Sequence, residues 1–301
     1  MTTNVIRSPL VKLLRTLKKS PLLVSVKRSI WGKYFDFRQK YFDSSRLNVC
    51  LAFPIFTPHS GGRYKDKARL TIQAINQTIP LLSAFALSGR QKQHNITRIE
   101  DFPVSAQDLE AAREIKICFD KYGSDKAGAN HYHNLYGPLL KNRDVITGIL
   151  EIGMGTNNTD VVSNMGLWGY PGASLKAFRD FLKSAMIFGA DIDKRILFED
   201  ERIKTFYVDQ TDPVTFTELG KSIPSDLDLV IDDGLHSPNA NLETLKFGLT
   251  KIKIGAWVVV EDIAPEALPL WEFVSALLPS NYEPHIFRGE SALVFAVRRL
   301  S

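Results

Sequence analysis

Cysteine is scarce in this chain of 301 residues, with only Cys50 and Cys118 present. Two cysteines exclude a disulfide framework and a Cys-rich zinc site, and they indicate a reducing compartment. Long apolar runs are also lacking, because stretches such as 21–26 and 79–87 fall far short of the roughly 20 residues that a membrane-spanning helix needs. No signal-peptide pattern follows the first basic residues. We therefore expect a cytoplasmic protein that does not cross a bilayer.

Acidic residues are rare in the first third of the chain. Residues 1–100 contain 18 Lys and Arg against 4 Asp and Glu, whereas residues 101–301 contain 20 against 29. In residues 1–46 basic side chains alternate with apolar and aromatic ones at helical spacing, which predicts basic amphipathic helices. Such helices either pack against the protein or lie on an anionic membrane surface, and both interpretations stay open. No nucleic-acid-binding motif accompanies the charge, so we do not expect a nucleic-acid partner.

Short apolar strands alternate with helices of about ten residues from residue 106 onward. Strands are expected at 148–152, 186–191, 204–208, 227–231 and 255–261, and two further strands at 285–288 and 293–298 would close the sheet as an antiparallel pair. This alternation predicts an α/β fold with a doubly wound, mostly parallel sheet of seven strands. We expect two regions, a basic and largely helical N-terminal extension over 1–105 and the α/β domain over 106–301.

A glycine-containing turn follows the first of these strands. Gly153 and Gly155 let the backbone bend sharply and approach a ligand closely. The turn lacks the third glycine of the dinucleotide-binding fingerprint, which disfavours that function. Acids instead stand near the ends of three successive strands, at Glu151, Asp191 and Asp209. They suit a nucleoside-like ligand with ribose hydroxyls, an exocyclic amine and a positive charge.

The ends of the next two strands carry further acids, Asp233 on one and Glu261 and Asp262 on the other. Because the carboxyl ends of parallel strands meet in one crevice, we expect these carboxylates to converge. An all-carboxylate set suits Mg²⁺, although a single acid could equally cap the following helix or turn. His236 lies three residues after Asp233 and is a candidate general base, since histidine changes charge near neutral pH.

Several segments together resemble a known enzyme family. These segments are 122–126, 131–136, 171–181, 207–212 and 231–236. They resemble the class I S-adenosylmethionine-dependent methyltransferases, and among these the macrolide-sugar O-methyltransferases of the mycinamicin and tylosin type. The similarity covers roughly residues 118–265, about half of the chain. The basic first 100 residues have no counterpart that we can match in those enzymes.

The resemblance implies a Rossmann-like methyltransferase fold, S-adenosyl-L-methionine and Mg²⁺ as cofactors, and a hydroxyl of a sugar or glycosylated small molecule as the acceptor. It implies Asp233, Glu261 and Asp262 as metal ligands and His236 as the base. For the donor, it implies Glu151 and Gly153 near the methionine part, Asp191 on the ribose, and Asp209 with Gln210 near the adenine, with Gly155 in the same turn.

Two other functions remain open at this stage. A hydroxylase of the cephamycin-pathway type looks similar in fold and acids. A non-catalytic, membrane-associated module could keep a donor pocket, but the intact set of acids argues against it. The sequence does not decide whether the chain forms a homo-oligomer, nor whether His131 and His133 belong to a lid over the site or merely pack against the sheet edge.

Overall fold

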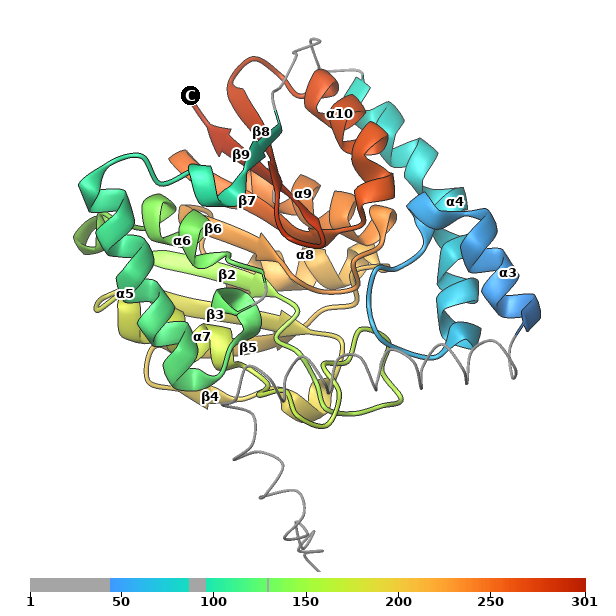
Figure 1. The fold of residues 1–301 in the computed structure, drawn as a ribbon, viewed down its shortest axis with the longest axis horizontal. Helices are drawn as coiled ribbons and strands as arrows, with labels where there is room; N and C mark the ends of the chain where they lie inside the picture. Colours follow the sequence, from blue (N-terminus) through green and yellow to red (C-terminus); the bar gives the residue numbers. More distant parts are fainter. Residues whose placement is uncertain (1–43, 87–95, 129) are drawn as a thin grey trace, which may run out of the picture.

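The computed structural model describes residues 44–86, 96–128 and 130–301, which form one large sheet with helices on both faces (Figure 1). The strands are β1 (Ile96–Arg98), β2 (Gly148–Ile152), β3 (Met186–Asp191), β4 (Glu199–Asp200), β5 (Ile203–Tyr207), β6 (Leu227–Asp232), β7 (Ile252–Ile263), β8 (Tyr282–Arg288) and β9 (Leu293–Arg299). They are ordered β1-β8-β9-β7-β6-β2-β3-β5-β4 across the sheet. Strands β7, β6, β2, β3 and β5 are parallel, while β9 is antiparallel to both β7 and β8.

The predicted α/β architecture is confirmed, including the antiparallel pair of β8 and β9, but the predicted strand number is wrong. The sheet has nine strands because β1 and β4 are added at its two edges. These strands have three and two residues and are mostly exposed, so neither carries the apolar run by which a buried strand is detected.

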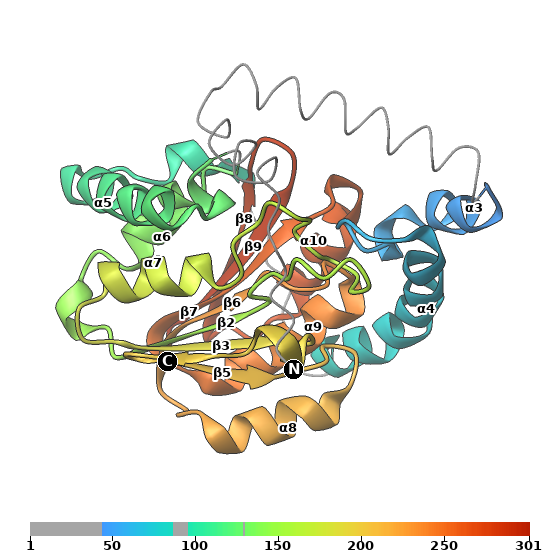
Figure 2. The ribbon, with the colours of Figure 1, turned by 90° about the horizontal axis from the view of Figure 1, so that it is seen from below.

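Helices cover both faces of the sheet, as the view in Figure 2 shows for α5, α6 and α7 on one side and α8 on the other. Helices α5 (Ala106–Tyr122), α6 (His133–Leu139) and α7 (Ala173–Phe181) share one buried apolar cluster with the sheet. Helices α8 (Pro213–Ser222), α9 (Pro238–Lys251) and α10 (Leu268–Leu277) share the other. The sequence sets the ends of α5 locally, through a capping box of Ser105 with Asp108 and through Gly123 in the left-handed region.

Within the N-terminal region, the described residues form α3 (Ser44–Ala52), the short helix η2 (Pro54–Phe56), α4 (Tyr64–Ala86), the edge strand β1 and the short helix η3 (Ile99–Asp101). Helix α4 stands beside α9 (Figures 1 and 2), where Asn239 Nδ2 donates to Gln77 Oε1 at 2.5 Å. Most of the basic helices predicted for 1–46 lie outside the described residues, and the boundary at 105/106 stays a prediction. In the described part of the chain, no helix is long and apolar enough to span a membrane.

Candidate functional site

A cavity of about 360 Å³ opens at the carboxyl ends of β2, β3, β5 and β6. This is the edge at which open α/β sheets bind ligands, because the turns that follow the parallel strands meet there. Of the predicted donor-binding residues, Gly153, Gly155, Asp191, Asp209 and Gln210 line the cavity. Glu151 does not, since its side chain is fully buried behind the turn.

The glycines of the turn after β2 are required by their surroundings as well as by their backbone. Gly153 and Gly155 have φ values of 94° and 76°, in the region that favours glycine. A Cβ on Gly153 would overlap the backbone of Asp233 and Gly234. The turn is then fixed from β3, because Asp191 Oδ2 accepts from the N–H of Met154 at 2.9 Å.

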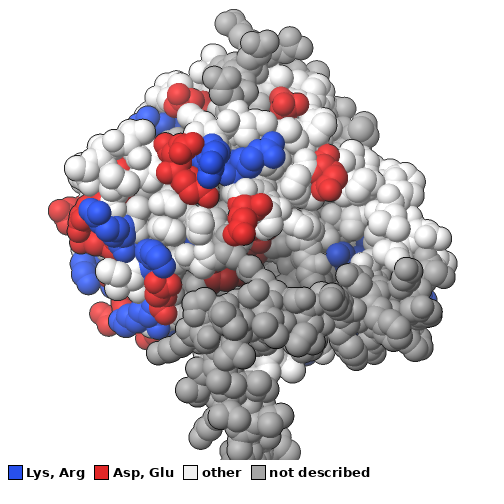
Figure 3. All heavy atoms as spheres, in the orientation of Figure 1, with Lys and Arg blue, Asp and Glu red and all other residues white. Residues whose placement is uncertain are grey.

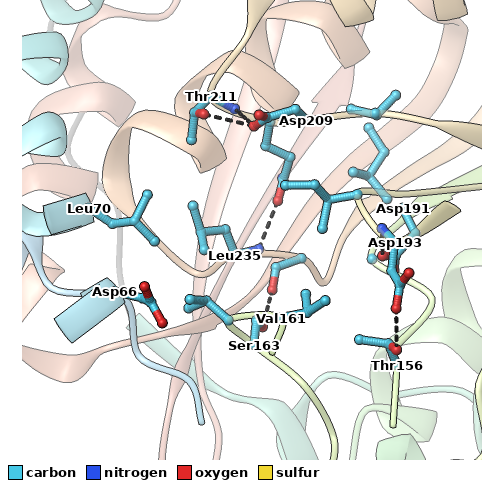
Figure 4. A pocket seen from close by; sticks show the side chains of 18 of the residues that line it. Asp66, Leu70, Thr156, Val161, Ser163, Asp191, Asp193, Asp209, Thr211 and Leu235 are labelled. Atoms are coloured by element: carbon cyan, nitrogen blue, oxygen red, sulfur yellow. Dashed lines mark hydrogen bonds between the residues drawn. The ribbon is translucent and has the colours of Figure 1, made fainter. Parts of the chain in front are cut away.

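The far wall of the cavity carries the pair predicted to lie near an adenine (Figure 4). Asp209 Oδ1 accepts from the Thr211 N–H and hydroxyl at 2.9 and 2.7 Å. The Gln210 amide is fully used, because it donates to Asp232 and Thr244 and accepts from the Leu235 N–H at 2.7 Å. Gln210 therefore fixes the loop after β6 against the end of β5.

Helix α4 contributes a wall that the sequence did not predict. Asp66, Arg69 and Leu70 line the same cavity, opposite the loop after β3 (Figure 4). Leu70 is 7% exposed and lies near Leu235, so these two side chains form the apolar part of a wall that also carries the charged Asp66 and Arg69. Residues of the N-terminal region therefore line the cavity together with residues that follow the strands.

A buried lysine lies at the centre of the acids behind the cavity. The Nζ atom of Lys126 lies 3.1 Å from Glu151, 2.7 Å from Asp233 and 2.6 Å from Glu261. These acids come from the ends of three neighbouring strands, and the Lys126 side chain is 2% exposed. The sequence contains Lys126 within the run 124–126, but nothing in it shows that the ammonium is enclosed by carboxylates.

The charges in this cluster do not balance. Burial lowers the pKa of Lys126, but Asp233, Glu261 and Glu151 outweigh it and raise that pKa well above its usual value. Burial also raises the pKa of Glu261 and of Glu151, with only partial relief from Lys126. Three carboxyl groups thus surround one ammonium, and a further cation at this place would favour their charged forms.

The atoms for such a cation are present beside Lys126. Ligand atoms of Asp233, His236 and Asp262 lie within 4.8 Å of one another. Asp233 gives Oδ2 to Lys126 and turns Oδ1 to within 3.7 Å of His236 Nε2. Asp262 accepts from the Tyr132 hydroxyl at Oδ1, at 2.5 Å, and turns Oδ2 to within 3.9 Å of the same nitrogen. Two carboxylate oxygens suit the oxygen preference of Mg²⁺.

Glu261, the third predicted metal ligand, lies next to this group but is used differently. Its Oε2 accepts from Lys126, and its Oε1 accepts from the Tyr136 hydroxyl. Its side chain is 1% exposed. The structure thus groups Asp233 and Asp262 with His236, while Glu261 lies outside that group and both of its oxygens already accept a hydrogen bond.

Tyr132 and Tyr136 are site residues that the sequence analysis missed. Their spacing of four places both hydroxyls on one side of α6, which is the one signal that could have found them. His131 and His133 lie outside the cavity lining, and His131 Nδ1 is 3.2 Å from Glu100 Oε1.

No protein-family model matches the chain. Two curated relatives match about half of it. The 8-demethyl-8-alpha-L-rhamnosyl tetracenomycin-C 2'-O-methyltransferase of Streptomyces olivaceus is 26% identical over 153 residues, 50% of this chain and 38% of the relative. The demethylmacrocin O-methyltransferase of Streptomyces fradiae is 33% identical over 144 residues, 48% of this chain and 33% of the relative. The match thus spans 38% of one relative and 33% of the other.

Solved structures of MycE, a methyltransferase from the mycinamycin biosynthetic pathway, are similar in fold. The complex with Mg and SAH has a TM-score of 0.50 and 19% identity, covering 62% of this chain and 55% of that one. The complex with Mg, SAH and mycinamycin VI also has a TM-score of 0.50, with 18% identity and coverage of 62% and 53%. The fold is that of the class I methyltransferases. The resemblance seen in the sequence is thereby confirmed.

Proposed function

We propose that this chain is an S-adenosylmethionine-dependent, Mg²⁺-dependent O-methyltransferase that acts on a hydroxyl of a sugar or glycosylated small molecule. One observation carries the proposal: Asp233 both lines the cavity and belongs to the group of Asp233, His236 and Asp262. A donor in the cavity would therefore lie directly beside a site able to bind a cation and accept a proton.

The relatives support this proposal over its alternatives. Both curated relatives are named as O-methyltransferases, and both names refer to glycosylated or macrolide-type small molecules. Neither is a hydroxylase, which favours methyl transfer over the cephamycin-type alternative. The cluster of acids disfavours a non-catalytic module, because Lys126 supplies a single positive charge among Glu151, Asp233 and Glu261 and a bound cation would stabilise the remaining charge.

The chain's own groups have separable roles in this reaction. Gly153 leaves room for the donor to approach the backbone, and Asp233 and Asp262 would hold the Mg²⁺. When bound, that ion would lower the pKa of the acceptor hydroxyl. His236 Nε2 would take the hydroxyl proton as the oxygen attacks the donor's methyl carbon and the carbon–sulfur bond breaks, and the two nearby carboxylates would stabilise the resulting imidazolium.

Methyl-labelled donor, Mg²⁺ and a fractionated cell extract test this function. We expect label in a glycoside-containing fraction, loss of transfer in EDTA and its recovery on adding Mg²⁺. His236→Ala should lower turnover by roughly 10² or more, the usual contribution of a general base. Transfer that is equally fast in EDTA would refute the metal role, and transfer to a nitrogen or carbon atom would refute the acceptor class.

We also propose that residues 1–46 contact an anionic membrane surface from the cytoplasm. The excess of basic residues in that segment supports this idea. Over α5, by contrast, charged side chains of both signs lie side by side (Figure 3). Each Lys or Arg near such a surface contributes about 1 kcal/mol. Replacing Lys18 and Lys19 by Gln should weaken sedimentation with anionic liposomes at low salt, whereas replacing the exposed Lys221 and Lys246 should not. Equal sedimentation of both double variants would contradict the proposal.

A further inference from the structure

Two residues of the group formed by Asp233, His236 and Asp262 have a left-handed backbone conformation. His236 and Asp262 have φ values of 52° and 51°. Residues other than glycine adopt this left-handed region rarely and keep it only where their surroundings impose it. Because φ fixes where Cβ points, this conformation determines whether the His236 ring faces the Asp262 carboxylate.

One residue contacts the backbone of both. The N–H of His59 donates to the carbonyl of His236 at 3.0 Å, and Nδ1 of its ring lies 3.3 Å from the carbonyl of Asp262. His59 precedes α4 and belongs to neither strand end. It thus joins the loop after β6 to the end of β7 from a segment that belongs to neither.

The segment that carries His59 is braced on both sides. Before it, the Thr57 hydroxyl donates to the carbonyls of Cys50 and Phe53 at 3.1 and 3.0 Å. After it, Lys67 Nζ donates to the carbonyl of Ser60 at 2.9 Å. The N–H of Ser163, a residue of the cavity lining, reaches the carbonyl of Gly61 at 3.3 Å. A fixed segment can hold the two loops in place, whereas a loose one could not.

The chemistry of the ring contact is set by its partner. A carbonyl oxygen accepts only, so Nδ1 of His59 carries the proton, and the exposed Nε2 takes no part in the contact. An imidazolium also carries a proton on Nδ1, so the contact persists in both protonation states.

We propose that His59 is a positioning residue of the site. Its ring and backbone hold the carbonyls of Asp262 and His236 so that both residues keep the left-handed conformation that turns their side chains toward each other. The role rests on the proposed function, because it serves the residues that hold the Mg²⁺ and take the proton. The segment that carries His59 would thereby help to position the site, a role that no sequence motif in this segment indicates.

The test compares His59→Ala, which removes the ring donor and keeps the main-chain N–H, with His59→Asn. The Asn amide nitrogen stands the same number of bonds from Cα as Nδ1 and can donate to the same carbonyl. Lys65→Ala is the matched control, because Lys65 is an exposed residue of the same segment that does not line the cavity. Four quantities are measured on the whole chain: Mn²⁺ affinity by electron paramagnetic resonance, S-adenosylhomocysteine affinity by calorimetry, methyl-transfer kinetics, and the midpoint of unfolding in urea.

We expect His59→Ala to weaken Mn²⁺ binding and to lower kcat, each about five- to tenfold, the usual effect of one lost hydrogen bond. In His59→Ala, S-adenosylhomocysteine affinity and the unfolding midpoint should stay at wild-type values. His59→Asn should restore most of the lost Mn²⁺ affinity and most of the lost kcat. Wild-type Mn²⁺ affinity and kcat in His59→Ala would overturn the role of His59 alone, as would a loss that Asn does not restore. A wild-type chain with neither Mn²⁺ affinity nor methyl transfer would instead overturn the proposed function, and the positioning role with it.

Discussion

The ammonium of Lys126 lies 2.6 Å from the carboxylate of Glu261, and both side chains are almost completely buried. The two residues are 135 positions apart in the chain. Their pairing joins the segment before α6 to the end of β7. Because Lys126 also contacts Asp233, it helps to hold the group formed by Asp233, His236 and Asp262 in place.

Removing this ammonium should destabilise the whole fold. Lys126→Met keeps much of the side-chain volume but leaves Glu151, Asp233 and Glu261 without their cation. We expect the free energy of unfolding in urea to fall by about 3–5 kcal/mol, as for other broken buried ion pairs. Lys116→Met, which removes an exposed pair with Asp120, should cost less than about 1 kcal/mol. Similar losses in the two variants would contradict this account of Lys126.

Much of the fold was predictable because burial on one or both faces leaves a periodic pattern. Strand β3 and helix α5 have such patterns and begin at the predicted residues, whereas β1 and β4 are too short to show one. Three acids of the site were found because strand ends are recognisable in sequence. Lys126 was not placed among them, since a buried lysine is rare and its partners are distant. His59 was missed for the same reason, because its contacts are more than 170 residues away.

Gly153 should be essential for donor binding. In Gly153→Ala the new methyl group would overlap the backbone after β6, so the loop must shift into the cavity. We expect S-adenosylhomocysteine affinity to fall about tenfold or more, the equivalent of one overpacked contact. Gly255→Ala is the matched control, because Gly255 also has a positive φ, 83°, but open space around its Cβ position. If both variants bind equally well, the turn after β2 does not shape the donor site.

Leu70 should contribute to donor affinity from α4. Its side chain forms part of the apolar wall of the cavity, so Leu70→Ala should weaken S-adenosylhomocysteine binding about three- to tenfold through lost apolar contact. Ile72→Ala, on the same helix but 53% exposed, should have no effect on binding. Unchanged affinity in Leu70→Ala would show that a bound donor does not reach α4.

His133 should make the fold less stable in mild acid. Burial lowers the pKa of His133 from its usual value of 6.5 to about 4, so the folded chain binds this proton more weakly than the unfolded chain does. Stability should therefore fall as the pH decreases from about 6.5 toward 4, and this contribution should vanish above 6.5. His133→Asn should unfold with a weaker pH dependence across that window. The same dependence in wild type and variant would exclude His133 as its source.

The central claim is that the cavity at the carboxyl ends of the strands binds an S-adenosyl donor beside the group of Asp233, His236 and Asp262. Calorimetric titration of the full chain with S-adenosylhomocysteine tests it most directly. The account predicts one molecule bound per chain, with saturation well below millimolar ligand and little binding to Gly153→Ala. A folded wild-type chain that binds no S-adenosylhomocysteine at millimolar concentration, with or without Mg²⁺, would contradict it.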